Sequence, residues 1–211
     1  MLTIPKRKTK GEVGPKDHGR KMSLKDFEFA KTEEGYHYEL SRGYITVSQV
    51  AKLYHALIIA ALRDHLGAYR LAHTDVIFAI LGAAECKLLI PDWESERHPD
   101  IAIYLAKPKG PKDDTVWRRW FPDLAIEVVS ERSVDRDYIE KREEYFTLGI
   151  KEYWIVDAKR EQIVVLRRGK SDWIEKRLGP DNTVTTKLLS GFKLPFQTIL
   201  DAAAQADVDS E

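Results

Sequence analysis

The chain has 211 residues, of which 43% are hydrophobic and 32% are charged, and its formal net charge is +0. This composition is typical of a soluble protein with a real core, and it argues against nucleic-acid binding through a global positive field. The single cysteine, Cys86, excludes an intrachain disulfide, and its context ECKLLI favours a small buried hydrophobe over a reactive thiol. No apolar run approaches the ~20 residues of a membrane span, and the basic N-terminus lacks a signal-peptide core, so we expect a cytoplasmic protein without a membrane partner.

Residues 1–22 are rich in Lys, Arg, Gly and Pro and predict a flexible basic tail. The tail is either an arm that contacts phosphates or simply a solvated segment. Residues 23–205 contain no internal repeat and no second boundary, so they predict one domain.

The first elements after the tail are a short helix over 24–31, capped by Ser23, and a hairpin. The runs YHYEL and YITVS, joined by a turn that contains glycine, predict the two strands of the hairpin. Ser48 is then the expected cap of a helix over 49–66 that ends at Gly67.

One face of this second helix is expected in the core, because Val50, Leu53, Leu57 and Ala61 keep helical spacing. His55 lies beside that face, where a structural or surface role is more common than a ligand role.

Strands are predicted at DVIFAIL, ECKLLI and DIAIYL, with a polar loop over 91–98 between the last two. The following segment, 107–120, has the Pro and Gly content of a loop. It interleaves basic residues with Trp117 and Trp120, a pattern that can hold nucleic acid, but Asp113 and Asp114 within it favour a solvated loop equally.

The remaining pattern predicts a strand over 121–130 and a helix over 134–148, capped by Ser133 and ended by Gly149. Strands follow at EYWIVD and QIVVLRR, and WIEKRL and TVTTKLL extend the sheet before a short apolar segment, LPFQTIL. This order predicts an α/β (mixed α+β) fold with a central mixed sheet flanked by helices.

Glu127 is an anomaly in the strand FPDLAIEVVS. It shares a face with Ala125 and Val129, while Leu124, Ile126 and Val128 line the other face. A buried carboxylate is costly unless it is compensated, so Glu127 requires a partner, a proton or a metal.

Asp100 repeats the pattern, since it shares a face with Ala102 in the strand of HPDIAIYL. Small alanine neighbours leave room for a ligand or a hydrated ion. The alternative is a plain strand-start residue after Pro99.

Lys141 breaks an otherwise apolar and aromatic stripe on the helix over 134–148. A helix that folds back over the strand would point Lys141 towards Glu127. Alternatively, the lysine extends to solvent along the stripe or pairs with Asp137 one turn back.

Together these side chains suit metal-assisted phosphodiester hydrolysis. Carboxylates bind Mg²⁺ or Mn²⁺, the metal activates water, and a lysine orients that water or stabilises the transition state. The sequence has no zinc-ligand spacing, no GxxxxGK[ST] loop and no G-x-S-x-G elbow.

At these residues the sequence resembles the Uma-two family, within the PD-(D/E)xK nuclease superfamily. The similar segments, in order over roughly residues 23–200, are YELSRG, HPDIAI, PDLAIEVVS, the series Asp137, Lys141, Tyr145 and Gly149, then KEYWIVD and LLSGFKLPFQTIL. The resemblance implies a restriction-endonuclease-like core.

The resemblance also implies a site. It implies Asp100 and Glu127 as metal-binding acids and Glu39, from YEL, as a third acid, although Glu39 alone reads equally well as an exposed strand residue. The superfamily places its lysine two residues after the second acid, where this chain has Val129. The family places the lysine on the following helix, the position of Lys141.

Asp123 also follows a proline, and we interpret it as a strand-edge residue, with His98, Ser130 and Tyr153 as further neighbours of the site.

Three functions follow from this reading. The first is an Mg²⁺-dependent (or Mn²⁺-dependent) endonuclease acting on DNA, with Lys141 assisting water activation or transition-state stabilisation. The second is a catalytically silent nucleic-acid-binding or interaction module on the same fold, and the third is a structural protein in which the anomalies are ordinary. Cutting both strands would be easiest for a symmetric homodimer, although no residue demonstrates one.

Overall fold

The computed structural model describes residues 11–49, 52–110, 113–130 and 133–207. It divides into two compact units, one made of residues 1–50 and 89–97 and the other of residues 51–88 and 98–211. The prediction of one domain over 23–205 stays a prediction. Within the described ranges, no helix has both the length and the apolar character that a membrane crossing needs.

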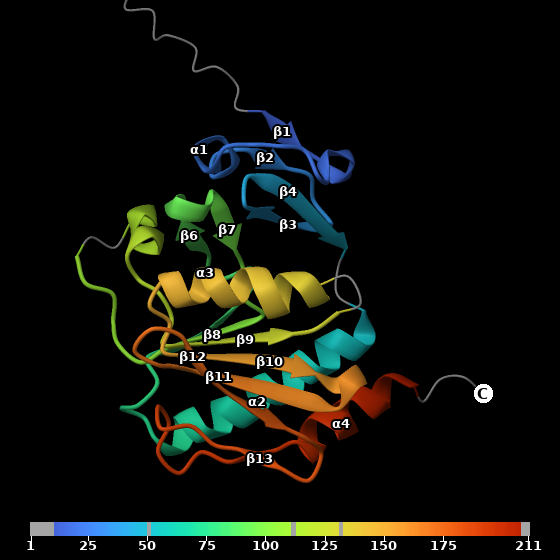
Figure 1. Cartoon of the computed structure of the whole chain (residues 1–211), viewed down its shortest axis with the longest axis vertical. Coiled ribbons are helices and arrows are strands. Elements are labelled where there is room, and N and C mark those ends of the chain that lie inside the picture. Colours follow the sequence, from blue (N-terminus) through green and yellow to red (C-terminus); the bar gives the residue numbers. More distant parts are fainter. Residues whose placement is uncertain (1–10, 50–51, 111–112, 131–132, 208–211) are drawn as a thin grey trace, which may run out of the picture. The chain divides into compact units, whose positions relative to one another are not determined.

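The first unit is built on a sheet of order β4-β3-β7-β6 (Figure 1). Its strands are β3 (Tyr36–Ser41), β4 (Tyr44–Gln49), β6 (Leu88–Ile90) and β7 (Ser95–Arg97). The predicted hairpin is present, and its turn residues Arg42 and Gly43 both have positive φ (50° and 81°), as the right-handed twist of a tight hairpin requires.

The N-terminal segment carries structure from residue 12 onward. The strands β1 (Glu12–Val13) and β2 (Lys31–Thr32) pair in parallel, around the short helices η1 (Pro15–Asp17) and α1 (Leu24–Phe27). Ser23 caps α1 by accepting a hydrogen bond from the Asp26 amide, as predicted, but the helix ends at Phe27 rather than residue 31. Residues 1–10 of the predicted tail lie outside the described residues.

The second unit contains a six-stranded sheet of order β12-β11-β10-β9-β8-β5. Only β9 and β10 pair in parallel, and the other pairs are antiparallel, so the sheet is mixed as predicted. Its strands are β5 (Ala79–Gly82), β8 (Ile101–Tyr104), β9 (Leu124–Val128), β10 (Glu152–Asp157), β11 (Gln162–Arg168) and β12 (Trp173–Leu178).

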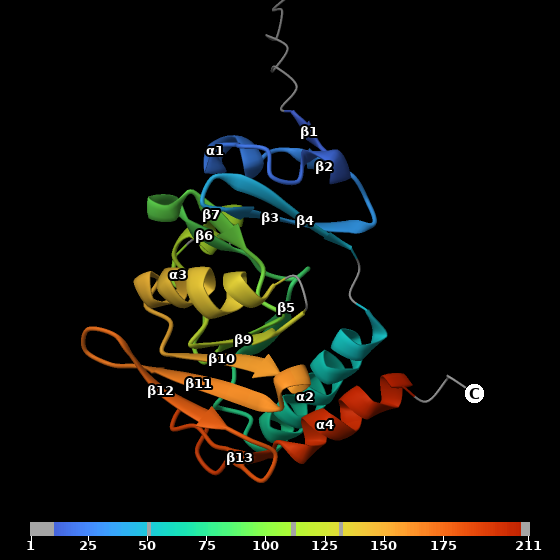
Figure 2. The ribbon, with the colours of Figure 1, turned by 45° about the vertical axis from the view of Figure 1, so that its right-hand side comes forward.

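Helices cover both faces of this sheet (Figures 1 and 2). The helices α2 (Leu53–Ala72) and α4 (Gln197–Ala204) pack on one face, where Ile58, Leu62 and Leu66 meet the apolar side chains of the central strands. The opposite face is covered by α3 (Lys141–Thr147) and the π-helical turn η4 (Arg136–Glu140) that precedes it. Fully burying such a Leu or Ile side chain contributes about 1.5–3 kcal/mol, so this layering holds the second unit together.

The segment β9–α3–β10 forms a parallel crossover, which determines where the site lies. Because β9 and β10 run in the same direction, the chain must return over the sheet between them, and the η4–α3 helix makes that return. Gly149 ends the helix with φ +83°, as predicted. A side chain on this helix can therefore point down onto β9.

The predicted helix over 49–66 is wrong at both ends. Ser48 belongs to β4, and α2 starts at Leu53 and continues through Gly67 to Ala72. Its buried positions are Ile58, Leu62, Leu66 and Tyr69. Of the predicted stripe, Leu57 and Ala61 are half-buried, Leu53 is 60% exposed, and Val50 lies outside the described residues. An apolar stripe that continues past Gly67 outweighs the helix-breaking tendency of one glycine.

Several predicted strands are shorter or pair elsewhere. The ECKLLI segment forms β6 in the smaller sheet, and the predicted polar loop after it contains the helix η2 (Pro91–Trp93) and β7. TVTTKLL does not extend the large sheet, because only β13 (Thr183–Val184) forms and pairs with β14 (Leu194–Pro195). The remaining short helices are η3 (Asp114–Arg118) in the predicted loop, η5 (Ala158–Arg160) and η6 (Gln205–Asp207).

Candidate active site

The two predicted metal-binding acids lie at the same end of adjacent strands. In the antiparallel pair of β8 and β9, Ile101 is opposite Ile126, so Asp100 and Glu127 are the next residues on each strand at that end. The Val128 amide donates a hydrogen bond to Asp100 Oδ2 at 2.8 Å, which ties Asp100 to the end of β9. The predicted faces are also present, because Leu124, Ile126 and Val128 join one core and Ala125 joins the other.

Glu127 is 2% exposed and is compensated by two partners from α3. The Lys141 ammonium nitrogen lies 2.8 Å from Glu127 Oε2, and the Tyr145 hydroxyl donates to Glu127 Oε1 at 2.5 Å. The helix therefore supplies a positive charge and a neutral donor to the two oxygens of one carboxylate. These contacts offset the cost of burying the charge, because a paired and hydrogen-bonded carboxylate is tolerated in a core.

Asp137 is a second buried acid beside Lys141. Its Oδ1 lies 3.1 Å from the Lys141 ammonium, at ion-pair distance but outside hydrogen-bond alignment. Burial raises the pKa of Asp137, although the Lys141 charge and the Ser133 hydroxyl pull the pKa down. Lys141 therefore makes both of the contacts considered from the sequence, one with Glu127 and one with Asp137 one helical turn back.

The π-helical turn η4 carries Asp137 into this position. The Lys141 amide donates to the Arg136 carbonyl, five residues back, instead of the usual four. Such wide turns are frequent at functional sites because they re-aim neighbouring side chains. The Tyr153 hydroxyl donates to the Asp137 carbonyl at 2.9 Å, so β10 anchors the same turn.

His55, in the first turns of α2, contacts Asp100. Its Nε2 lies 2.9 Å from the Val128 carbonyl and 3.3 Å from Asp100 Oδ2. Burial lowers the pKa of His55, but the hydrogen bond and negative charge of Asp100, together with the Val128 carbonyl and Glu127, outweigh burial and leave this pKa raised.

The other neighbours named from the sequence have structural contacts. Asp123 is a strand-edge residue at the opposite end of β9, where it accepts from the Leu105 amide and pairs with Lys151 at 2.7 Å. His98 Nδ1 lies 3.0 Å from the carbonyls of Ala83 and Cys86. The Ser130 amide donates to the Ser133 hydroxyl, which shapes the turn into the helix.

Glu39 belongs to the first unit. It lies on β3, is largely buried, and has Arg97 Nη1 3.6 Å from its Oε2. Its predicted part as a third acid stays a prediction.

A hydrated divalent ion fits the donor set of Asp100 and Glu127. Asp100 Oδ1 has no hydrogen-bond partner among the described residues, and Glu127 supplies a second carboxylate at the neighbouring strand end. Nowhere in the described part of the chain do three or more His, Cys, Asp or Glu side chains gather as a metal-binding group. Mg²⁺ commonly takes one or two carboxylates and completes its shell with waters and substrate phosphates, so two acids suffice.

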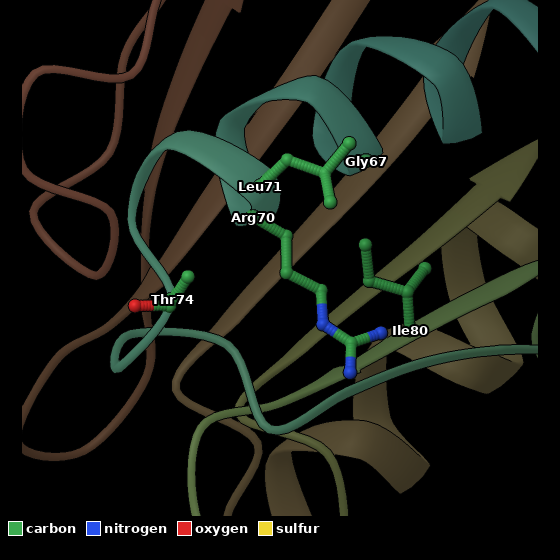
Figure 3. Close-up of a pocket in the computed structure, with 5 residues that line it drawn as sticks. All are labelled: Gly67, Arg70, Leu71, Thr74 and Ile80. Atoms are coloured by element: carbon green, nitrogen blue, oxygen red, sulfur yellow. The ribbon is translucent and has the colours of Figure 1, made fainter.

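Two other features are separate from these acids. A pocket of about 400 Å³ is lined by Gly67, Arg70, Leu71, Thr74 and Ile80, and Figure 3 shows the Arg70 side chain lying beside Ile80. Its arginine donates to the Phe78 carbonyl at 2.9 Å, so it braces the edge of β5. Cys86 is buried, and burial raises the pKa of its thiol to about 12, which agrees with the predicted role of a small hydrophobe.

The tryptophans of the 107–120 segment pack against a buried cluster and do not project into solvent. The Trp120 ring lies 3.9 Å from the Tyr104 ring, centroid to centroid, and its indole donates to the Ala106 carbonyl. Trp117 packs against the same cluster of Cys86, Ala102 and Tyr104. The aromatic residues of this segment therefore serve a core, which favours the structural interpretation of the loop.

The second unit is a mixed sheet with helices on both faces and a helix between its two parallel strands, and a solved structure shares this fold. The crystal structure titled as that of a "putative nuclease belonging to DUF820" from Anabaena variabilis matches it with a TM-score of 0.62, over 86% of this chain and 99% of that chain. At 15% identity this likeness shows the fold. The chain belongs to the Uma2 family, described as "Putative restriction endonuclease", whose family model matches residues 24–197. No curated protein matches the chain.

The sequence does not predict three contacts of this site. Tyr145 and Asp137 belong to the series that resembles the family, but no bond from Tyr145 to Glu127 is expected and Asp137 is expected only to pair with Lys141, while His55 is expected to have a structural or surface role. A polar group at i+4 from Lys141 on the same helix face was the available signal for Tyr145. His55 offered none, because its partners come from β8 and β9.

Proposed function

We propose that this protein is a divalent-metal-dependent nuclease that hydrolyses phosphodiester bonds in DNA. Asp100 and Glu127 are the metal-binding acids, and Lys141 is the catalytic cation. The observation that supports this most strongly is the buried contact between Lys141 and Glu127, 2.8 Å long, at the strand end that also carries Asp100. A nuclease family and fold are consistent with this chemistry.

In this proposal Asp100 and Glu127 hold Mg²⁺ or Mn²⁺, which when bound lowers the pKa of a coordinated water and neutralises charge on the phosphate. Lys141 keeps a positive charge beside the carboxylates, where it orients the attacking water or stabilises the pentacovalent phosphate. Tyr145 holds the Glu127 carboxylate in one orientation. Because Lys141 is only 4% exposed, its charge acts with little screening by water.

Glu39 is the proposed third acid near the metal, and a homodimer is the proposed assembly for cutting both strands of a duplex. DNA is the proposed substrate because the family is described as a restriction endonuclease. RNA cleavage is a distinct outcome of the test below.

The test is nicking of supercoiled plasmid by purified protein with Mg²⁺, with Mn²⁺ and with chelator. Asp100→Asn and Glu127→Gln keep side-chain size and remove the charges that bind metal. We expect metal-dependent nicking by the unchanged protein and a loss of about 100-fold or more in each variant, as removal of a transition-state contact typically costs. Glu39→Gln, assayed in parallel, tests the third acid.

A matched control is available at the other end of β9. Asp123→Asn removes a carboxylate that pairs with a lysine, as Glu127→Gln does, but far along the strand from the metal-binding acids. This variant should nick at the normal rate. The catalytically silent binding module would be favoured instead if metal binding requires Asp100 and Glu127 but the protein cleaves no plasmid, single-stranded DNA or RNA.

A further inference from the structure

His55 is held by two acceptors at the end of the sheet that carries the proposed metal-binding acids. Its Nε2 lies 2.9 Å from the Val128 carbonyl and 3.3 Å from Asp100 Oδ2. Its side chain is 16% exposed. The contact joins α2 to β8 and β9 at one point.

The neighbours of Nε2 determine where the proton lies on the ring. A carbonyl oxygen and a carboxylate oxygen are both acceptors, so Nε2 must carry a hydrogen. It donates this hydrogen to the Val128 carbonyl, and Asp100 Oδ2 lies at ion-pair distance from the same nitrogen. The other nitrogen, Nδ1, is buried and has no hydrogen-bond partner among the described residues. His55 therefore presents an N–H towards Asp100 in either charge state.

Asp100 Oδ2 is held from two sides. Oδ2 accepts from the Val128 amide at 2.8 Å and lies 3.3 Å from His55 Nε2, at ion-pair distance, whereas Oδ1 has no hydrogen-bond partner in the described ranges. A hydrogen bond and a charge contact on the same carboxylate oxygen restrict the rotation of the group. They leave Oδ1 available to an incoming ligand.

We propose that His55 is a positioning residue that fixes the Asp100 carboxylate through Nε2–H, so that Oδ1 is presented to the divalent metal. This inference rests on the proposed function, because it names the residue that prepares one metal ligand. Ordering the carboxylate before the metal arrives removes part of the entropic cost of binding. Partners of metal ligands typically change metal affinity by about 10–100-fold when they are removed.

The test is titration of chelator-treated protein with Mn²⁺, in which electron paramagnetic resonance measures the free ion. His55→Phe keeps a ring and removes the donor, and we expect it to weaken Mn²⁺ binding by about 10–100-fold. A second comparison uses His55→Gln and His55→Asn, which introduce amides of similar polarity but different length. The Gln amide reaches the place of Nε2 and should restore binding, whereas the shorter Asn amide should not.

His65 supplies the matched control on the same helix. Its Nε2 also contacts a main-chain carbonyl, that of Lys193 at 2.6 Å, but no carboxylate. His65→Phe should therefore leave Mn²⁺ affinity unchanged. Equal weakening by His55→Phe and His65→Phe would overturn the inference, because the effect would then come from helix docking.

Asp100→Asn separates failure of this inference from failure of the proposed function. If Asp100→Asn loses Mn²⁺ binding and His55→Phe binds normally, the positioning role is overturned and the metal site stands. If the unchanged protein and Asp100→Asn bind Mn²⁺ equally weakly, the proposed metal site fails and the role of His55 fails with it.

Discussion

At the residue scale, the charge balance around Lys141 explains how an acid can sit inside a strand. Glu127, Asp137 and Lys141 are all buried, so two carboxyl groups share one ammonium. Burial raises the pKa of Asp137, which means that the folded protein resists a second negative charge there. The lysine is the group on which this arrangement depends.

Replacing the lysine should therefore be costly. Lys141→Met keeps the side-chain length and removes the charge, and we expect a loss of about 3–5 kcal/mol in the free energy of unfolding at pH 7, as breaking a buried ion pair costs. Urea denaturation with chelator present measures it. Lys151→Met removes the partner of Asp123, but that lysine is 59% exposed, so its loss should cost about 1 kcal/mol or less. An equal loss of unfolding free energy in Lys141→Met and Lys151→Met would contradict the buried ion pair assigned to Lys141.

His55 makes a stability contribution that depends on pH. Its pKa is raised in the folded protein, so folding favours the protonated ring. The contribution is complete below the unfolded pKa of about 6.5 and is lost as the pH rises through the higher folded pKa. His55→Gln should thus destabilise metal-free protein more at pH 6 than at pH 9. Urea curves at both pH values check this, and a larger effect at pH 9 would show the opposite sign.

The sequence was informative where a residue broke a pattern. Glu127 interrupted an apolar strand face and Lys141 interrupted an apolar helix stripe, and the two side chains meet in the structure. His55 broke no pattern, because its partners are a main-chain carbonyl and a carboxylate that lie more than 40 positions away along the chain. Such contacts leave no local trace in a sequence.

At the element scale, the three strands that follow the crossover helix were the most predictable part. β10, β11 and β12 match the predicted segments EYWIVD, QIVVLRR and WIEKRL residue for residue, because apolar runs there end at clear turn residues. The errors fall on short strands such as β6 and β7. Their pairing partner lies elsewhere in the chain, which a local pattern cannot reveal.

Two glycines near helix ends should respond oppositely to the same change. Gly67 lies inside α2 and Gly149 follows α3 with φ +83°, and an added Cβ would meet nothing within 4 Å at either. Gly67→Ala should stabilise the protein by about 1 kcal/mol through helix propensity. Gly149→Ala should destabilise it by about 1–2 kcal/mol, because a side chain disfavours the left-handed conformation.

Thermal or urea unfolding of the two variants in parallel checks the pair. Because the added methyl group contacts nothing at either glycine, the difference between the two variants reports backbone conformation and not side-chain packing. Stabilisation by Gly149→Ala would mean that the helix does not end in the left-handed turn described.

At the scale of the whole molecule, the lysine of the candidate site lies on the crossover helix and not next to the strand. Two residues after Glu127 the chain has Val129, which is buried in the core under α3. Lys141 reaches Glu127 from that helix instead, with the ammonium 2.8 Å from the carboxylate. The central claim is that this lysine is catalytic as well as structural.

The most direct measurement compares plasmid nicking by Lys141→Met and Lys151→Met. Mn²⁺ should be at saturating concentration, and the temperature one at which urea curves show both variants folded. The account predicts that Lys141→Met still binds Mn²⁺ but loses nicking by about 100-fold or more, as loss of a transition-state contact typically costs, while Lys151→Met nicks at the normal rate. Normal nicking by folded, Mn²⁺-bound Lys141→Met would contradict the account, because the lysine would then serve only to balance the buried charge.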